Sequence, residues 1–238
     1  MRGLNRTAVV LALALTYSNA VMVGIPLVGL AWGDAGLVTL LTLIPVHSLL
    51  LLTSATLALE LVLARDESAQ AASVRAPNVV GRMWRVVAQA LRKALLHPVP
   101  LPIIAGLLFA QTGLQVPVWL DLPMRWLGSA FGPLALSLVG ITLAGSVIGV
   151  QLRGALVLTA IKNLLVPALA AWLGWVFGMH GLPLAVMVVT AALPIGANVF
   201  LFSQRYGVAQ DLVTAGVAVS TAMALVTVSA VMLLAGRV

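Results

Sequence analysis

Two short stretches decide the fold that we expect: SNAVMVGIPL at residues 18–27 and AALPIGANVF at residues 191–200. Each places helix-breaking and polar residues inside a long apolar run. These residues are Ser18, Asn19, Gly24 and Pro26 in the first stretch and Pro194, Gly196 and Asn198 in the second. Proline removes one backbone donor and leaves a carbonyl without its helical partner. In hydrocarbon, a broken helix is tolerated only where it is buried in protein or lines a wet cavity. The two stretches therefore predict a polar site inside a membrane.

The composition of the whole chain supports a membrane setting. Of the 238 residues, 62% are apolar and 8% are charged, whereas soluble domains average about 45–50% and about 25%. The sequence contains no cysteine, and its histidines, His47, His97 and His180, lie far apart. We therefore expect no metal and no cofactor. No basic stretch alternates with aromatic residues, so we expect no nucleic-acid partner either.

Seven stretches are long and apolar enough to cross a bilayer, which takes about 20 residues each. They run over residues 7–32, 36–63, 98–114, 126–150, 154–178, 183–204 and 210–236. None alternates with a period of two, so we expect helices rather than the strands of a barrel. The fold class that follows is an all-α membrane protein, a polytopic helical bundle.

The positions of Lys and Arg predict the orientation of this bundle. If the seven spans alternate, most cations fall on the side of the N-terminus, in the loops before span one and after spans two, four and six. We therefore expect a multi-pass protein of a bacterial inner membrane, with a cytoplasmic N-terminus and a periplasmic C-terminus. The first residues also resemble a signal peptide. Because further spans follow at once, we expect that this segment is not cleaved.

The long loop over residues 65–97 divides the chain. Its second part, from Val80 to Leu95, has apolar residues at helical spacing, with arginines mostly on the other side. Two interpretations stay open: an amphipathic helix on the cytoplasmic leaflet, or an extension of the next span.

The two unusual stretches occupy matching places with opposite directions. The first lies in a span that runs outward and the second in a span that runs inward, and one further span follows each before its half ends. Such a pair is what an inverted repeat requires. The alternative is that each proline produces only a local kink.

Four stretches of the sequence resemble a known family. The stretches SNAVMVGIPL, LGSAFGPLALSLVGITLAG, KNLLVPALAAWL and ALPIGANVFLFSQRYG are similar to the auxin efflux carrier family, in particular to its bacterial, malonate-transporter-like branch. The resemblance implies two inverted repeats of five helices, in which two broken helices cross at the substrate site. It places the breaks at Pro26 and Pro194 and the neighbouring amides at Asn19 and Asn198.

The domain organisation departs from that pattern. Residues 98–238 supply five spans, whereas residues 1–64 supply two, and residues 65–97 form the loop between them. The resemblance therefore implies an N-terminally truncated inverted-repeat secondary transporter that lacks three helices.

Further polar residues within the spans include Lys162, Asn163 and His47. Lys162 stands eight residues after Gly154, about 12 Å into a core about 30 Å thick. It either faces the crossing and binds a carboxylate or reaches back to the headgroups. Asn163 either faces the cavity or caps a neighbouring carbonyl, and the second is expected. His47 either titrates near neutral pH or donates to a carbonyl, and again the second is expected.

These features favour secondary transport by alternating access, and the resemblance implies a small organic anion, such as malonate, as the substrate. The expected binding residues are Ser18, Asn19, Gly24, Pro26, Lys162, Pro194, Gly196 and Asn198. The expected partners are the bilayer and the anion, and a homodimer stays open. A non-transporting fragment or assembly partner is the alternative. An intramembrane enzyme is disfavoured because the acidic residues map to loops and span ends.

Overall fold

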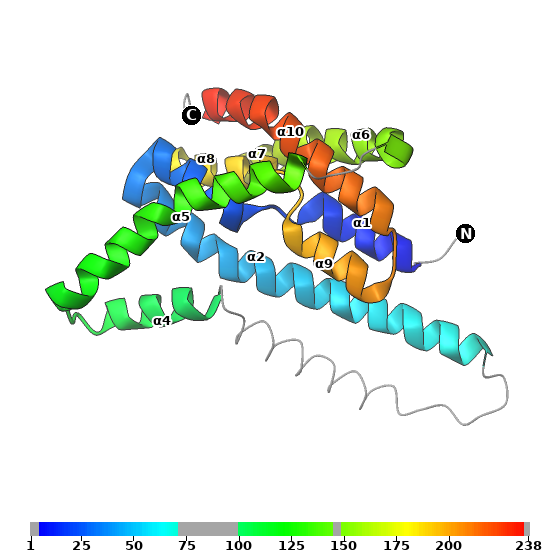
Figure 1. The fold of residues 1–238 in the computed structure, drawn as a ribbon, viewed down its shortest axis with the longest axis horizontal. Coiled ribbons are helices and arrows are strands. Elements are labelled where there is room, and N and C mark those ends of the chain that lie inside the picture. Colours follow the sequence, from blue (N-terminus) through cyan, green and yellow to red (C-terminus); the bar gives the residue numbers. More distant parts are fainter. Residues whose placement is uncertain (1–4, 71–99, 145–148, 236–238) are drawn as a thin grey trace.

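The computed structural model describes residues 5–70, 100–144 and 149–235 (Figure 1). All regular structure in these ranges is helical. The elements are α1 (Arg6–Thr16), η1 (Ala20–Gly24), α2 (Ile25–Gln70), α4 (Pro100–Gln111), α5 (Val118–Ala144), η2 (Gly149–Gln151), α6 (Leu152–Ala160), η3 (Ile161–Leu165), α7 (Val166–Val176), α8 (Gly181–Ala192), α9 (Ala197–Tyr206) and α10 (Gln210–Ala235). Here η1 and η3 are single π-helical turns, and η2 is a 3₁₀ turn.

Three continuous helical stretches of the described residues are long and apolar enough to cross a membrane. They are Ala20–Leu63, Leu152–Val176 and Gln210–Ala235. Large apolar side chains on many helices are exposed, as lipid-facing residues should be; Leu30 and Leu225 are examples. The predicted class, an all-α polytopic membrane protein, is confirmed at this level. The number of seven spans and the division at residues 64 and 98 stay predictions.

The boundaries of the first two expected spans differ from the prediction. Helix α2 joins the end of the first expected span to the whole of the second, and the helical pattern is interrupted only at Gly33, which has φ 58° and ψ −147°. A left-handed φ is easily adopted by glycine because it has no Cβ. The expected turn near residues 33–35 is therefore a sharp kink at one glycine.

Helix α5 begins at Val118, well before the expected start of the fourth span at residue 126. Asp121 and Arg125 lie one helical turn apart, and their side chains form an ion pair of 2.7 Å. The helix thus continues through the two charges, because spacing of four residues lets them pair on the exposed surface. The predicted amphipathic segment over residues 80–95 lies outside the described residues.

Two large apolar clusters hold the described helices together. One joins α1 and α9 to the later part of α2, through buried residues that include Val10, Leu13, Leu59, Val199 and Phe202. The other joins the early part of α2 to α8 and α10, through Val28, Leu40, Val189, Leu193 and Val228. Helix α10 packs along α6 and α8, and α2 packs against α1 and α8. The two polar stretches of the sequence lie between these clusters.

Candidate functional site

Both unusual stretches are broken in the structure. Helix α1 ends at Thr16 and η1 begins at Ala20, while α8 ends at Ala192 and α9 begins at Ala197. We call residues 17–19 the first break and residues 193–196 the second break. Helical hydrogen bonds stop in both segments, so their backbone groups need other partners within the membrane.

The two breaks supply these partners to each other. Ser18 and Ile195 form an isolated antiparallel bridge. The Asn19 amide donates to the Pro194 carbonyl over 2.9 Å, and the Gly196 amide donates to the Tyr17 carbonyl over 2.9 Å. Segments about 180 positions apart thus satisfy one another's backbone. The two stretches that the sequence analysis singled out thus lie against each other, and their crossing as part of an inverted repeat stays a prediction.

Glycine is required where the breaks approach most closely. A Cβ on Gly196 would lie 2.6 Å from Tyr17 Cδ1 and 3.1 Å from the Ser18 carbonyl oxygen. A Cβ on Gly24, at the end of η1, would lie 2.8 Å from Leu193 Cδ1. Both predicted glycines therefore act by letting the two chain segments touch.

The first break does not lie at Pro26, where the resemblance places it. Pro26 is the second residue of α2 and is buried, whereas the helix is interrupted seven positions earlier, at residues 17–19. The helix is continuous from Ala20, with the π-helical turn η1 directly before α2, so the N–H that Pro26 lacks falls inside a helical stretch that this proline does not end. Pro194 does lie within its break, and its carbonyl is one of the crossing acceptors.

The two predicted amides hold the break regions in different ways. The Asn19 side chain caps η1 by accepting from the Met22 amide over 3.4 Å. Asn198, in the first turn of α9, donates from Nδ2 to the Tyr17 hydroxyl over 2.8 Å. That hydroxyl also lies 3.0 Å from Ser48 Oγ on α2. Asn19 thus fixes a helix start, and Asn198 ties the second break to the first.

Lys162 extends from η3 to the crossing. Its side chain is 0% exposed, and Nζ donates to Ser18 Oγ over 2.8 Å and to the Ala191 carbonyl over 2.7 Å. The alternative in which Lys162 reaches back to the headgroups is therefore wrong. Both acceptors are neutral oxygens, so neither compensates the charge of an ammonium.

Asn163 occupies the opposite side of the same π-helical turn. Its Nδ2 donates to the Ser220 carbonyl over 3.1 Å and to Thr227 Oγ1 over 3.2 Å, both on α10. Ser220 Oγ in turn accepts from the Ile195 amide over 3.1 Å. The expectation that Asn163 caps a carbonyl is confirmed, and the contact connects η3 through α10 to the second break.

His47 lies beside the first break, one helical turn from Leu43 on α2. Its Nε2 accepts from the Ser18 amide over 3.3 Å, and its ring centroid is 5.1 Å from that of Tyr17. The expectation that this histidine donates to a carbonyl is wrong for this nitrogen. The reason is that the break at residues 17–19 leaves a backbone N–H without a helical acceptor.

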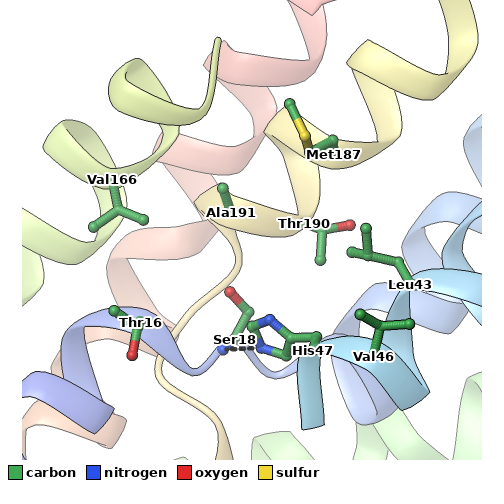
Figure 2. Close-up of a pocket in the computed structure, with 9 residues that line it drawn as sticks. All are labelled: Thr16, Ser18, Leu43, Val46, His47, Val166, Met187, Thr190 and Ala191. Carbon is green, nitrogen blue, oxygen red and sulfur yellow. Dashed lines mark hydrogen bonds between the residues drawn. The ribbon is translucent and has the colours of Figure 1, made fainter. Parts of the chain in front are cut away.

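A cavity of about 290 Å³ opens next to these contacts (Figure 2). Its lining residues are Thr16, Ser18, Leu43, Val46, His47, Val166, Met187, Thr190 and Ala191. Figure 2 shows Ser18 and His47 side by side, joined by their hydrogen bond, with Leu43 and Val46 coming from α2. Both acceptors of Lys162 belong to this wall. A water molecule takes about 30 Å³ of liquid, so the cavity has room for a molecule of several heavy atoms.

Of the predicted binding residues, only Ser18 lines this cavity. Lys162 stands behind its wall, and the others build the crossing that supports it. The sequence analysis missed Thr16, Tyr17 and Thr190. Their signal was weak, because an isolated hydroxyl in an apolar helix usually bonds its own backbone, as Thr190 does with the Val186 carbonyl. Among the described residues, no group of three metal-ligating side chains occurs.

Comparison with known proteins identifies the family of the chain. The family described as "Membrane transport protein" matches residues 1–232. The chain belongs to this family. The membrane transport protein family includes the auxin efflux carriers, so the resemblance drawn from the two breaks is confirmed.

Two curated members of the membrane transport protein family are similar to parts of the chain. A "Putative malonate transporter" of Rhizobium meliloti (strain 1021) is 30% identical over 146 residues, which are 60% of this chain and 45% of that protein. A "Probable auxin efflux carrier component 9" of Oryza sativa subsp. japonica is 39% identical over 57 residues, which are 24% of this chain and 13% of that protein. The matches thus cover less than half the length of each curated relative.

Proposed function

We propose that this chain is a secondary transporter that moves a small organic anion across the membrane by alternating access. The observation that carries the proposal is the Lys162 ammonium, which is buried at the crossing of two broken helices and held against the wall of a cavity. A buried ionisable group within a membrane span marks a functional site by default.

The charge of the site favours an anion. Burying a cation without a counter-charge is unfavourable, and the two acceptors that hold Lys162 are a hydroxyl and a carbonyl. An ammonium carries three N–H donors, so a third remains for a ligand once the wall that Ser18 and Ala191 form has moved aside. A carboxylate from the cavity would then accept this hydrogen bond and balance the charge. The same lysine would repel a cationic ligand.

The packing favours alternating access. The two apolar clusters are separate, and the crossing between them is made by short polar contacts. Transporters with inverted repeats move one rigid unit against another around such a midplane site. Helices α1 and α9 belong to the first cluster, and η1 and α8 belong to the second, whereas α2 and α10 contribute residues to both. The breaks are thus the natural place at which the two units would rotate.

The substrate class comes from the relatives. One is named as a malonate transporter and the other as an auxin efflux carrier component, and both names refer to small carboxylates. We therefore propose a carboxylate, with malonate as the first candidate. The cavity has the volume for it, and Thr16, Ser18 and Thr190 line it with hydroxyl groups.

The test is uptake by the purified chain in liposomes. We expect radiolabelled malonate, or another small carboxylate of a panel, to accumulate with time in wild-type vesicles and not in vesicles that contain Lys162→Gln. Arg153→Gln is the matched control, because Arg153 is an exposed cation near the start of α6, in the same continuous helical stretch as Lys162. Vesicles that take up no carboxylate, together with a protein that binds none, would contradict the proposal and favour a non-transporting fragment.

A further inference from the structure

Among the described residues that line the cavity, His47 alone has a titratable side chain. Its Nε2 accepts a hydrogen bond from the Ser18 amide. A ring nitrogen can accept only while it carries no proton. The hydrogen bond in the structure is therefore that of a neutral imidazole.

Ser18 connects this imidazole to Lys162. Its backbone N–H donates to His47, and its hydroxyl accepts from the Lys162 ammonium. His47 and Lys162 thus hold the same residue of the first break from two sides. A change in the charge of either side chain therefore acts on a residue that also contacts the other.

The groups around His47 include no carboxylate among the described cavity-lining residues. The first break presents the Tyr17 ring and Ser18, η3 presents the Lys162 charge, and α8 presents Met187, Thr190 and Ala191. Val166 of α7 and Leu43 and Val46 of α2 complete the wall. A proton on His47 would therefore place a second positive charge beside the first, with nothing in the wall to balance it.

A doubly charged anion would balance the charge of Lys162 and the charge of a protonated His47. We propose that His47 takes up a proton when a dicarboxylate dianion enters the cavity, so that proton and substrate occupy the site and cross the membrane together. One carboxylate then accepts from Lys162 and the other from the imidazolium. The proton comes from water on the side of entry, resides on Nε2 and is released to water on the other side.

Protonation of His47 also removes a hydrogen bond at the crossing of the two breaks. A protonated Nε2 is a donor and faces the Ser18 N–H, which is also a donor, so the 3.3 Å hydrogen bond between them is lost. Ser18 is part of the antiparallel bridge between the two breaks. Loading with both proton and dianion thus weakens a contact that ties α2 to the first break, at the place where the units would move. This inference rests on the proposed transport of an anion.

The direct test uses the unmodified protein. Purified chain in a weakly buffered detergent solution, at a pH where malonate is a dianion, is mixed with malonate in the presence of a pH-sensitive dye. We expect close to one proton to be taken up for each malonate bound, and none to be taken up when acetate, a monocarboxylate, binds. Malonate binding without proton uptake would overturn the coupling and leave the transport proposal standing.

Variants then assign the proton to His47. The Gln side chain in His47→Gln can still accept from the Ser18 amide but cannot take up a proton in this range. We expect malonate affinity of the wild type to fall about tenfold per pH unit above neutrality, as one linked proton requires, and that of His47→Gln to be weak and independent of pH. His180→Gln is the matched control, because His180 is exposed in the turn before α8, and it should behave as wild type.

Three further results of these binding experiments would each decide one part of the proposal. A pH slope that persists in His47→Gln would overturn the assignment to this residue. If His47→Gln does not fold, the proton count of the wild type decides whether coupling exists. If the wild type binds no carboxylate at any pH, the proposed function itself fails, which is a different result from binding without a proton.

Discussion

Lys162 and Ser18 are 144 positions apart in the chain, yet Lys162 Nζ donates to Ser18 Oγ over 2.8 Å in a buried site. This contact joins the π-helical turn η3 to the first break. Together with the bond from Nζ to the Ala191 carbonyl at the end of α8, it makes one cation the common partner of both broken helices. An anion that binds this cation therefore contacts a group on which both breaks depend.

The first prediction concerns the charge of Lys162. Lys162→Gln keeps a donor of similar length but removes the positive charge, so carboxylate affinity should fall about ten- to a hundredfold. Hydrogen bonds to charged groups contribute about 1.5–3 kcal/mol, and each 1.4 kcal/mol is a factor of about ten. Equilibrium binding of radiolabelled malonate measures the change. Arg153→Gln should bind as wild type, and equal affinity in Lys162→Gln would show that the ammonium does not contact the substrate.

The second prediction concerns the close approach of the two breaks. In Gly196→Ala, the added Cβ would meet the Tyr17 ring at 2.6 Å and the Ser18 carbonyl at 3.1 Å. Tyr17 is itself buried, so the crossing has to separate, at a cost of about 1–3 kcal/mol. We expect a lower thermal midpoint in detergent. Gly128→Ala, in helix α5, is the control, because no atom lies within 4 Å of its added Cβ and alanine is the better helix former.

Much of the crossing could be predicted from the sequence, because its signals are local. Pro194 and Gly196 interrupt a helix by their own covalent structure, and apolar runs around them identify the membrane. The predicted position of the first break was less accurate. Pro26 is the stronger breaker by type, yet the chain leaves the helix at Tyr17 because the second break supplies hydrogen-bond partners there. That preference depends on residues far away in the sequence and has no local signal.

The same limit applies to the polar side chains of the site. Whether Lys162 points to the headgroups or to the crossing depends on Ser18 and Ala191, which lie in other elements. His47 could be recognised as buried, but its acceptor role follows from an N–H that only the break leaves unpaired. The sequence indicated which residues are unusual, whereas their partners came from the packing.

The third prediction concerns the orientation of the protein in the membrane. The sequence contains no cysteine, so single cysteines can be introduced without removing others. Phe177 at the end of α7 is 79% exposed, and Arg205 in the last turn of α9 is also exposed. If the cytoplasmic side holds most cations, a membrane-impermeant maleimide should label Phe177→Cys in intact spheroplasts, and Arg205→Cys only after lysis. Labelling of Arg205→Cys in intact spheroplasts would contradict the predicted orientation.

The fourth prediction concerns the bond between Asn198 and Tyr17, the side-chain contact that joins the second break to the first. Tyr17→Phe and Asn198→Ala each remove one end of a 2.8 Å hydrogen bond, so each should destabilise the protein by about 1 kcal/mol. The double variant should lose about 1 kcal/mol less than the sum, since the shared bond is lost only once. Denaturant unfolding in mixed micelles measures the four free energies.

A second cycle controls for general effects of these substitutions. Thr112 follows α4, and its hydroxyl contacts only its own turn, through the Phe109 carbonyl and the Leu114 amide. Tyr17→Phe and Thr112→Ala share no partner, so their effects should add. If Tyr17→Phe and Asn198→Ala also add, the bond does not couple the breaks. If they are coupled and the Asn198→Ala vesicles still take up malonate at the wild-type rate, the contact stabilises the crossing without taking part in its movement.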